Sequence, residues 1–116
     1  MGNNIKTGEE GEMLAVEYLQ AKGFEILQRN YRSARSEIDI IAKDGLVLVF
    51  VEVKLRSMQG FGFPEEAVND KKWEMIMQGA ESYIESAGWS GAIRFDIVSI
   101  VKKKKIEIVH FEDALS

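Results

Sequence analysis

The chain of 116 residues has no cysteine, one proline and one histidine. Without cysteine, the chain can form neither a disulfide nor a zinc site built on thiolates. No apolar run approaches the roughly 18–20 residues of a membrane-spanning helix, and the N-terminal segment MGNNIKTGEEGE lacks the apolar stretch of a signal peptide. We therefore expect a cytoplasmic protein that does not enter the membrane.

The chain also lacks an excess of basic residues, and its net charge is −4 at pH 7. Nucleic-acid-binding domains are usually basic, but the local field at a cleft matters more to a polyanion than the net sum does. The basic residues are unevenly placed, and we expect the run of four lysines to be a solvated surface. The basic groups are Arg29, Arg32 and Arg35; Lys54 and Arg56; Lys71 and Lys72; and Lys102 to Lys105.

Hydrophobic periodicity and turn residues predict two helices and five strands. The first helix spans 7–22, with Thr7 as N-cap and Gly23 ending it, and the second has Pro64 in its first turn and runs to about residue 86. The order helix, three strands, helix, two strands predicts an α/β sandwich with a mixed sheet and a helix on each side. The length suits one domain, 1–116. The strands are expected at 24–32, 37–43, 46–55, 92–101 and 106–111.

Two neighbouring apolar strands contain charged residues, in the segments SEIDIIA and LVLVFVEVKLR. Burying a charge costs free energy unless the charge is paired or binds a metal. The sequence Asp44-Gly45 between the strands predicts a two-residue hairpin loop, so that Asp39 faces Phe50 and Glu37 faces Glu52. Side chains alternate along a strand. The charged side chains expected on one face are therefore Glu37, Asp39, Glu52 and Lys54.

Carboxylates that converge across such a hairpin suit a hard cation such as Mg²⁺ or Mn²⁺. We expect Asp39 and Glu52 to bind the metal, and Lys54 to orient or activate water or to stabilise charge on phosphorus. Glu12, at the edge of the apolar stripe of the first helix, would approach the metal directly or through water. The alternatives are a surface ion pair for Glu52 and Lys54, and a partly exposed helix residue for Glu12.

Other polar and aromatic residues have structural interpretations. Glu37 is either a second metal ligand or, as we favour, a residue at the rim of the sheet paired with Arg35 or Lys54. His110 is expected on the surface, and Asp96 is expected to be a structural hydrogen-bond acceptor. The aromatic residues of the loop after the site would either stack on unpaired bases or pack over the helix; they are Phe61 and Phe63.

Six sequence blocks resemble the YraN family of small bacterial proteins. They are GxxGExxA (8–15), RNYR (29–32), EIDIIA (37–42), FVEVKLR (50–56), the FGxP-like segment ending at Pro64, and RFDIV (94–98). One departure is Ser36, where the family usually has glycine. The family is grouped with the restriction-endonuclease-like PD-(D/E)xK proteins and is similar to archaeal Holliday-junction resolvases. The resemblance implies a tRNA-endonuclease-like three-layer α-β-α sandwich with the site Glu12, Asp39, Glu52 and Lys54.

The resemblance and the residue pattern together lead us to expect a Mg²⁺- or Mn²⁺-dependent endonuclease that hydrolyses phosphodiester bonds in DNA, including branched or processed DNA. The alternative is a catalytically silent nucleic-acid-binding or adaptor module that retains the fold. Since the junction-cleaving relatives act as dimers, the resemblance also implies a homodimer.

Overall fold

The computed structural model describes residues 3–57 and 69–115, except the side chains of residues 3–8 and 57. The predicted order of two helices and five strands is confirmed, and the last strand has the predicted bounds. The elements are α1 (Asn3–Ala21), β1 (Glu25–Ser33), β2 (Ser36–Asp44), β3 (Val47–Ser57), α2 (Asp70–Ala87), β4 (Ile93–Lys102) and β5 (Ile106–Phe111).

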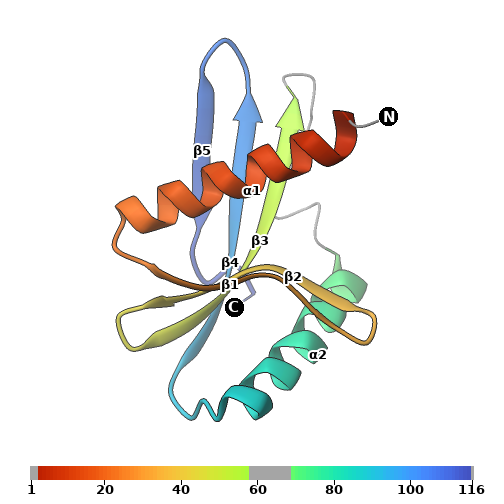
Figure 1. The fold of residues 1–116 in the computed structure, drawn as a ribbon, viewed down its shortest axis with the longest axis vertical. Coiled ribbons are helices and arrows are strands. Elements are labelled where there is room, and N and C mark those ends of the chain that lie inside the picture. The colour runs from red at the N-terminus through yellow and green to blue at the C-terminus, as the bar shows by residue number, and fades with distance from the viewer. Residues whose placement is uncertain (1–2, 58–68, 116) are drawn as a thin grey trace.

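The five strands form one sheet in the order β1-β2-β3-β4-β5. The pairs β1–β2, β2–β3 and β4–β5 are antiparallel, whereas β3 and β4 are parallel. The sheet is therefore mixed, as expected, and α2 lies in the connection between its two parallel strands (Figure 1).

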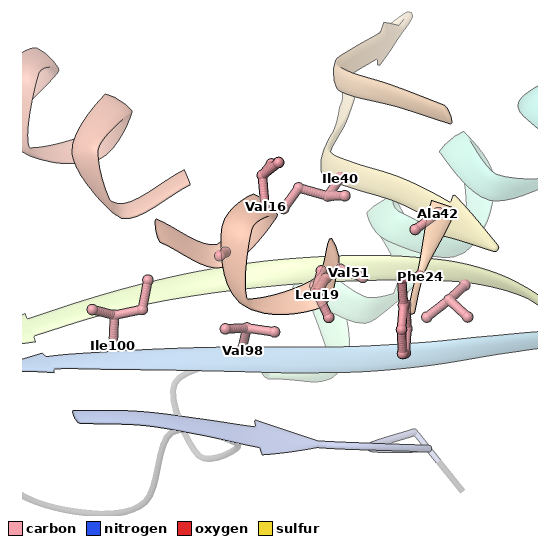
Figure 2. Packing of buried hydrophobic residues seen from close by; sticks show 10 residues of the cluster. Val16, Leu19, Phe24, Ile40, Ala42, Val51, Val98 and Ile100 are labelled. Atoms are coloured by element: carbon pink, nitrogen blue, oxygen red, sulfur yellow. The ribbon is translucent and has the colours of Figure 1, made fainter. Parts of the chain in front are cut away.

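One face of the sheet packs against α1 (Figures 1 and 2). Val16 and Leu19 of α1 contact a layer of apolar side chains from the four strands β1 to β4 or their flanks. Figure 2 shows Val51, Val98 and Ile100 beneath the helix. This hydrophobic core holds α1 across the sheet. Its buried members are Ala15, Val16, Leu19, Phe24, Ile40, Ala42, Val49, Val51, Val98 and Ile100.

The opposite face packs against α2 through Trp73, Ile76 and Ala80. Successive β3 residues alternate between the two cores, since Phe50 contacts the α2 side and Val51 the α1 side. Strand alternation produces this pattern when both faces of a sheet are covered. The mixed sheet thus has one helix on each face.

Helix α1 begins at another position than the sequence predicts. Helix α1 begins at Asn3, so the prediction of Thr7 as its N-cap is wrong, whereas Gly23 ends it with a positive φ of 98°. The described start of α2 has Asn69 as N-cap, whose side chain accepts a hydrogen bond from Lys72 N. Pro64 lies outside the described residues. An Asx cap at residue 69 fixes the helix start because it satisfies a free amide of the first turn.

The β2–β3 hairpin has a register other than the predicted one. Asp44 pairs with Val47, so the loop is Gly45-Leu46 rather than Asp44-Gly45. Gly45 has a φ of 62°, and glycine at the first of two loop positions is the pattern of a type II′ turn. Since both loops have two residues, the pairing shifts while the side chains between Ile40 and Val51 keep their predicted faces.

Candidate functional site

Asp39 lies where β2 separates from β3. The ladder between the strands ends at Ile40, which pairs with Val51. Beyond this pair, the Val53 amide donates a hydrogen bond of 2.8 Å to Asp39 Oδ2. The neighbours Ile38 and Ile40 pack in opposite cores, although simple alternation would place them on one face. The carboxylate of Asp39 therefore occupies the fork between the two strands.

Glu52 meets Asp39 at this fork. If the observed register is continued by one residue, Asp39 lies opposite Glu52. The predicted register had placed Asp39 opposite Phe50. The Glu52 side chain is 6% exposed. Burial raises the pKa of Asp39 to about 7, with further contributions from the charges of Glu52 and Glu12 and a hydrogen bond to Glu52, opposed by the Val53 amide. The two carboxyl groups thus converge as the sequence predicts, by a different pairing.

Two ammonium groups approach the same oxygen of Glu52. Lys54 Nζ lies 3.4 Å and Lys72 Nζ 3.5 Å from Glu52 Oε2. Lys54 reaches it along β3, and Lys72 reaches it from the first turn of α2. Sequence reasoning found Lys54 and missed the role of Lys72, since no local pattern shows that α2 begins beside the end of β3.

Glu12 approaches the fork from α1. Its carboxylate lies 3.6 Å from Arg29 NH2 of β1, and its side chain is 18% exposed. Its negative charge also contributes to the raised pKa of Asp39. The structure therefore brings all four predicted site residues together, with Arg29 and Lys72 as additional cationic neighbours.

The donor set at the fork fits a hard divalent cation. Within residues 3–57 and 69–115, no group of three or more histidine, cysteine, aspartate or glutamate side chains is placed to hold a metal ion. Mg²⁺ nevertheless keeps several waters and is bound in many proteins by one or two carboxylates together with substrate phosphates. Asp39 and Glu52 could supply those two carboxylates, and the charge of Glu12 acts on the same Asp39 carboxyl.

Two buried polar atoms belong to side chains that strand alternation places on the same face of the sheet as Phe50 and Ile97. Ser99 pairs with Lys54 in the parallel register and is 0% exposed. Its hydroxyl and the Arg56 Nε are buried without a hydrogen-bond partner in the described part of the chain. Sequence reasoning missed Ser99, because a serine in an apolar strand gives no signal of its neighbours.

Glu37 lies outside the fork. Its predicted position opposite Glu52 is wrong, because β2 no longer pairs with β3 beyond Ile40. Arg32 Nε donates a hydrogen bond of 3.0 Å to Glu37 Oε2, so Glu37 forms an ion pair, as favoured, but with Arg32 rather than with Arg35 or Lys54. The two are cross-strand partners in the β1–β2 register.

The side chain of His110 is buried, so the prediction of a surface histidine is wrong. Its side chain is 2% exposed, with Nε2 2.8 Å from Asp96 Oδ2 and Nδ1 2.9 Å from Lys22 Nζ. Because an ammonium only donates, Nδ1 accepts and Nε2 donates to Asp96. Asp96 also accepts from Arg94 and the Asp113 amide. Burial opposes ionisation, but these hydrogen bonds hold the pKa of Asp96 below its usual range.

Four further predictions concern Asp96, the lysine run, one loop and the membrane. Asp96 is a buried hydrogen-bond acceptor, as predicted, and the lysine run is exposed at the end of β4 and in the turn to β5. Phe61 and Phe63 lie outside the described residues. None of the described helices is both long and apolar enough to cross a membrane.

Known proteins resemble this chain over nearly all of its length. The UPF0102 protein of Christiangramia forsetii is 42% identical over 115 residues, which cover 98% of this chain and 97% of that protein. The UPF0102 protein of Thermodesulfovibrio yellowstonii is 44% identical over 110 residues, covering 95% and 96%. The sequence profile described as "Uncharacterised protein family UPF0102" matches residues 11–100, which include every residue of the fork. The chain therefore belongs to family UPF0102, the YraN family that its sequence blocks resemble.

Proposed function

We propose that this protein is a Mg²⁺- or Mn²⁺-dependent nuclease with a restriction-endonuclease-like fold. The observation that carries the proposal is the meeting of Asp39 and Glu52 at the strand fork, with the Lys54 ammonium 3.4 Å from Glu52. Two carboxylates and a lysine in a partly buried site are the groups that metal-assisted phosphodiester hydrolysis requires. A divalent ion bound there would polarise the phosphoryl oxygen and stabilise the leaving oxygen.

The residues of the fork have separate tasks in this proposal. Asp39 and Glu52 would hold the metal, and the hydrogen bond from the Val53 amide fixes the Asp39 carboxyl in place. Lys54 orients the attacking water or stabilises the charge that develops on the phosphoryl oxygens. Glu12 acts through water, and Arg29 holds its carboxylate toward the fork.

A surface beside the fork suits a phosphate backbone. Arg32 and Arg35 line a shallow hollow of about 330 Å³ at the turn between β1 and β2, together with Glu37, the ion-pair partner of Arg32. The Arg29 side chain, 37% exposed, comes from the same strand β1. Exposed arginines neutralise phosphates without reading sequence. We therefore propose DNA as the substrate, with branched or processed DNA and a homodimeric enzyme suggested by the family resemblance.

Cleavage assays test this proposal directly. Supercoiled, single-stranded and branched DNA are incubated with Mg²⁺ or Mn²⁺, and with a chelator as the blank. We expect Asp39→Asn, Glu52→Gln and Lys54→Ala each to lower the cleavage rate at least about a hundredfold, because each removes a group of the metal site. Glu74→Gln, on the exposed side of α2, is the matched control. Equal rates in wild type and all three purified, folded variants would contradict the proposal.

The second candidate is a catalytically silent nucleic-acid-binding or adaptor module. It is favoured by the ion pairs of the fork, because Glu52 has two lysine partners that would compete with a cation for its carboxylate. Such a module would bind DNA with the same affinity with and without a divalent ion, and the affinity would not change in Asp39→Asn. A nuclease site would instead show saturable Mn²⁺ binding that Asp39→Asn abolishes.

A further inference from the structure

Lys72 is a fixed but accessible cation at the fork. It is the third residue of α2, and its backbone amide donates a hydrogen bond of 2.9 Å to the N-cap side chain of Asn69. Its side chain is 43% exposed, whereas that of its partner Glu52 is 6% exposed. The backbone of Lys72 is therefore anchored, while its ammonium can reach both Glu52 and a ligand in solvent.

The ion pairs of the fork each join opposite charges. Glu52 pairs with Lys54 and Lys72, and Glu12 pairs with Arg29. The basic side chains are Arg29, Lys54 and Lys72. A divalent cation at Asp39 and Glu52 would add two positive charges beside these three and would compete with two ammonium groups for Glu52 Oε2. Metal binding without a compensating anion is therefore opposed by the repulsion of like charges.

From this competition for Glu52 we propose that Lys72 binds the phosphodiester and makes the binding of metal and nucleic acid interdependent. The inference rests on the proposed nuclease function and names a substrate-binding residue for it. When the cation takes Glu52, the released Lys72 ammonium donates to a non-bridging phosphate oxygen. The anionic phosphate in turn offsets the charge of the cation. By linkage, each ligand then raises the affinity for the other by the same factor.

The interdependence predicts a particular response to removal of the Lys72 charge. Lys72→Met keeps the aliphatic stem and removes one positive charge beside Glu52. We expect this variant to bind Mn²⁺ alone several-fold more tightly than wild type, because one competitor for Glu52 is gone. We expect it to bind a DNA oligonucleotide more weakly in the presence of Mn²⁺. A purely structural role for Lys72 would not raise the affinity for the metal.

Calorimetric titration of Mn²⁺ tests the inference without any measurement of cleavage. The metal is titrated alone and in the presence of a short phosphorothioate oligonucleotide, which keeps the backbone charge and resists hydrolysis. In wild type we expect the oligonucleotide to tighten Mn²⁺ binding about tenfold, within the usual range of coupling between sites. In Lys72→Met the tightening should fall below about threefold. Lys71→Met is the matched control, since Lys71 is exposed and has no ion pair with another described residue.

The outcomes separate this inference from the proposed function. Equal Mn²⁺ affinity with and without the oligonucleotide, or equal behaviour of Lys72→Met and Lys71→Met, would overturn the role of Lys72 and leave the metal site standing. Absence of Mn²⁺ binding in wild type under both conditions would overturn the metal site and the inference together. Circular dichroism of each variant shows whether it is folded.

Discussion

At the scale of single residues, Asp39 is the carboxyl group whose pKa the fold raises. It is a carboxyl that burial and two neighbouring acids keep from ionising at its usual pH, and its pKa is about 7. Such perturbed groups concentrate at functional sites, where a ligand rather than the fold compensates the charge. The hydrogen bond from the Val53 amide fixes the position of Asp39, so the backbone holds this carboxyl in the environment that raises its pKa.

The raised pKa predicts how stability depends on pH. The folded state binds the Asp39 proton more tightly than the unfolded state, so the contribution of Asp39 to stability falls as pH rises from about 4 through about 7. Asp39→Asn removes this loss and can still accept the Val53 hydrogen bond. We expect the free energy of unfolding of the variant, relative to that of wild type, to be about 1–3 kcal/mol higher at pH 8 than at pH 5. Urea unfolding of both proteins at the two pH values measures it, and the same difference at both would contradict the prediction.

At the scale of elements, the site depends on how α2 packs against the start of β2. Ser36 Oγ donates a hydrogen bond of 2.7 Å to the Met75 carbonyl, and Ser36 is 4% exposed. Opposite it, Gly79 leaves no space for a side chain, since an added Cβ would lie 2.9 Å from the Ser36 Cβ. The departure at Ser36 from the glycine of the family resemblance is thus accommodated by a glycine on the facing helix.

This contact predicts an unusual effect of a glycine-to-alanine change in a helix. Gly79→Ala would stabilise an ordinary helix by about 1 kcal/mol. Here we expect it to lower the free energy of unfolding, because the methyl group meets Ser36 and the end of Ile38. In a Ser36→Gly background the loss should shrink or reverse. Thermal or urea unfolding of the four proteins gives the coupling, and additive effects would show that the two residues do not meet.

The elements also show what the sequence could and could not predict. Hydrophobic periodicity and turn residues are local, so the element order and the bounds of β5 follow from them. The hairpin register does not follow from local signals, because Asp-Gly is compatible with two loops and only the observed pairing of Asp44 with Val47 distinguishes them. Burial of His110 depends on Asp96 in the neighbouring strand, and the role of Lys72 depends on the start of another element. Contacts between distant segments leave no local pattern.

At the scale of the whole molecule, the fork gathers side chains from both faces and the middle of the sheet. Glu12 comes from α1, Asp39 from β2, Glu52 from β3 and Lys72 from α2. Since these elements hold the groups in place only when the domain is folded, a metal that binds them stabilises the native state. We expect Mn²⁺ to raise the melting temperature of wild type and to leave that of Asp39→Asn unchanged. An equal rise in both proteins, measured by calorimetry, would indicate binding elsewhere.

The location of a bound ion tests the central claim most directly. Crystals soaked with Mn²⁺ give an anomalous difference map in which a single ion can be placed without reference to activity. The account predicts a peak between the carboxylates of Asp39 and Glu52, with Lys54 beside it, and no such peak in crystals of Asp39→Asn. A map of wild type at saturating Mn²⁺ with no peak at these carboxylates would contradict it.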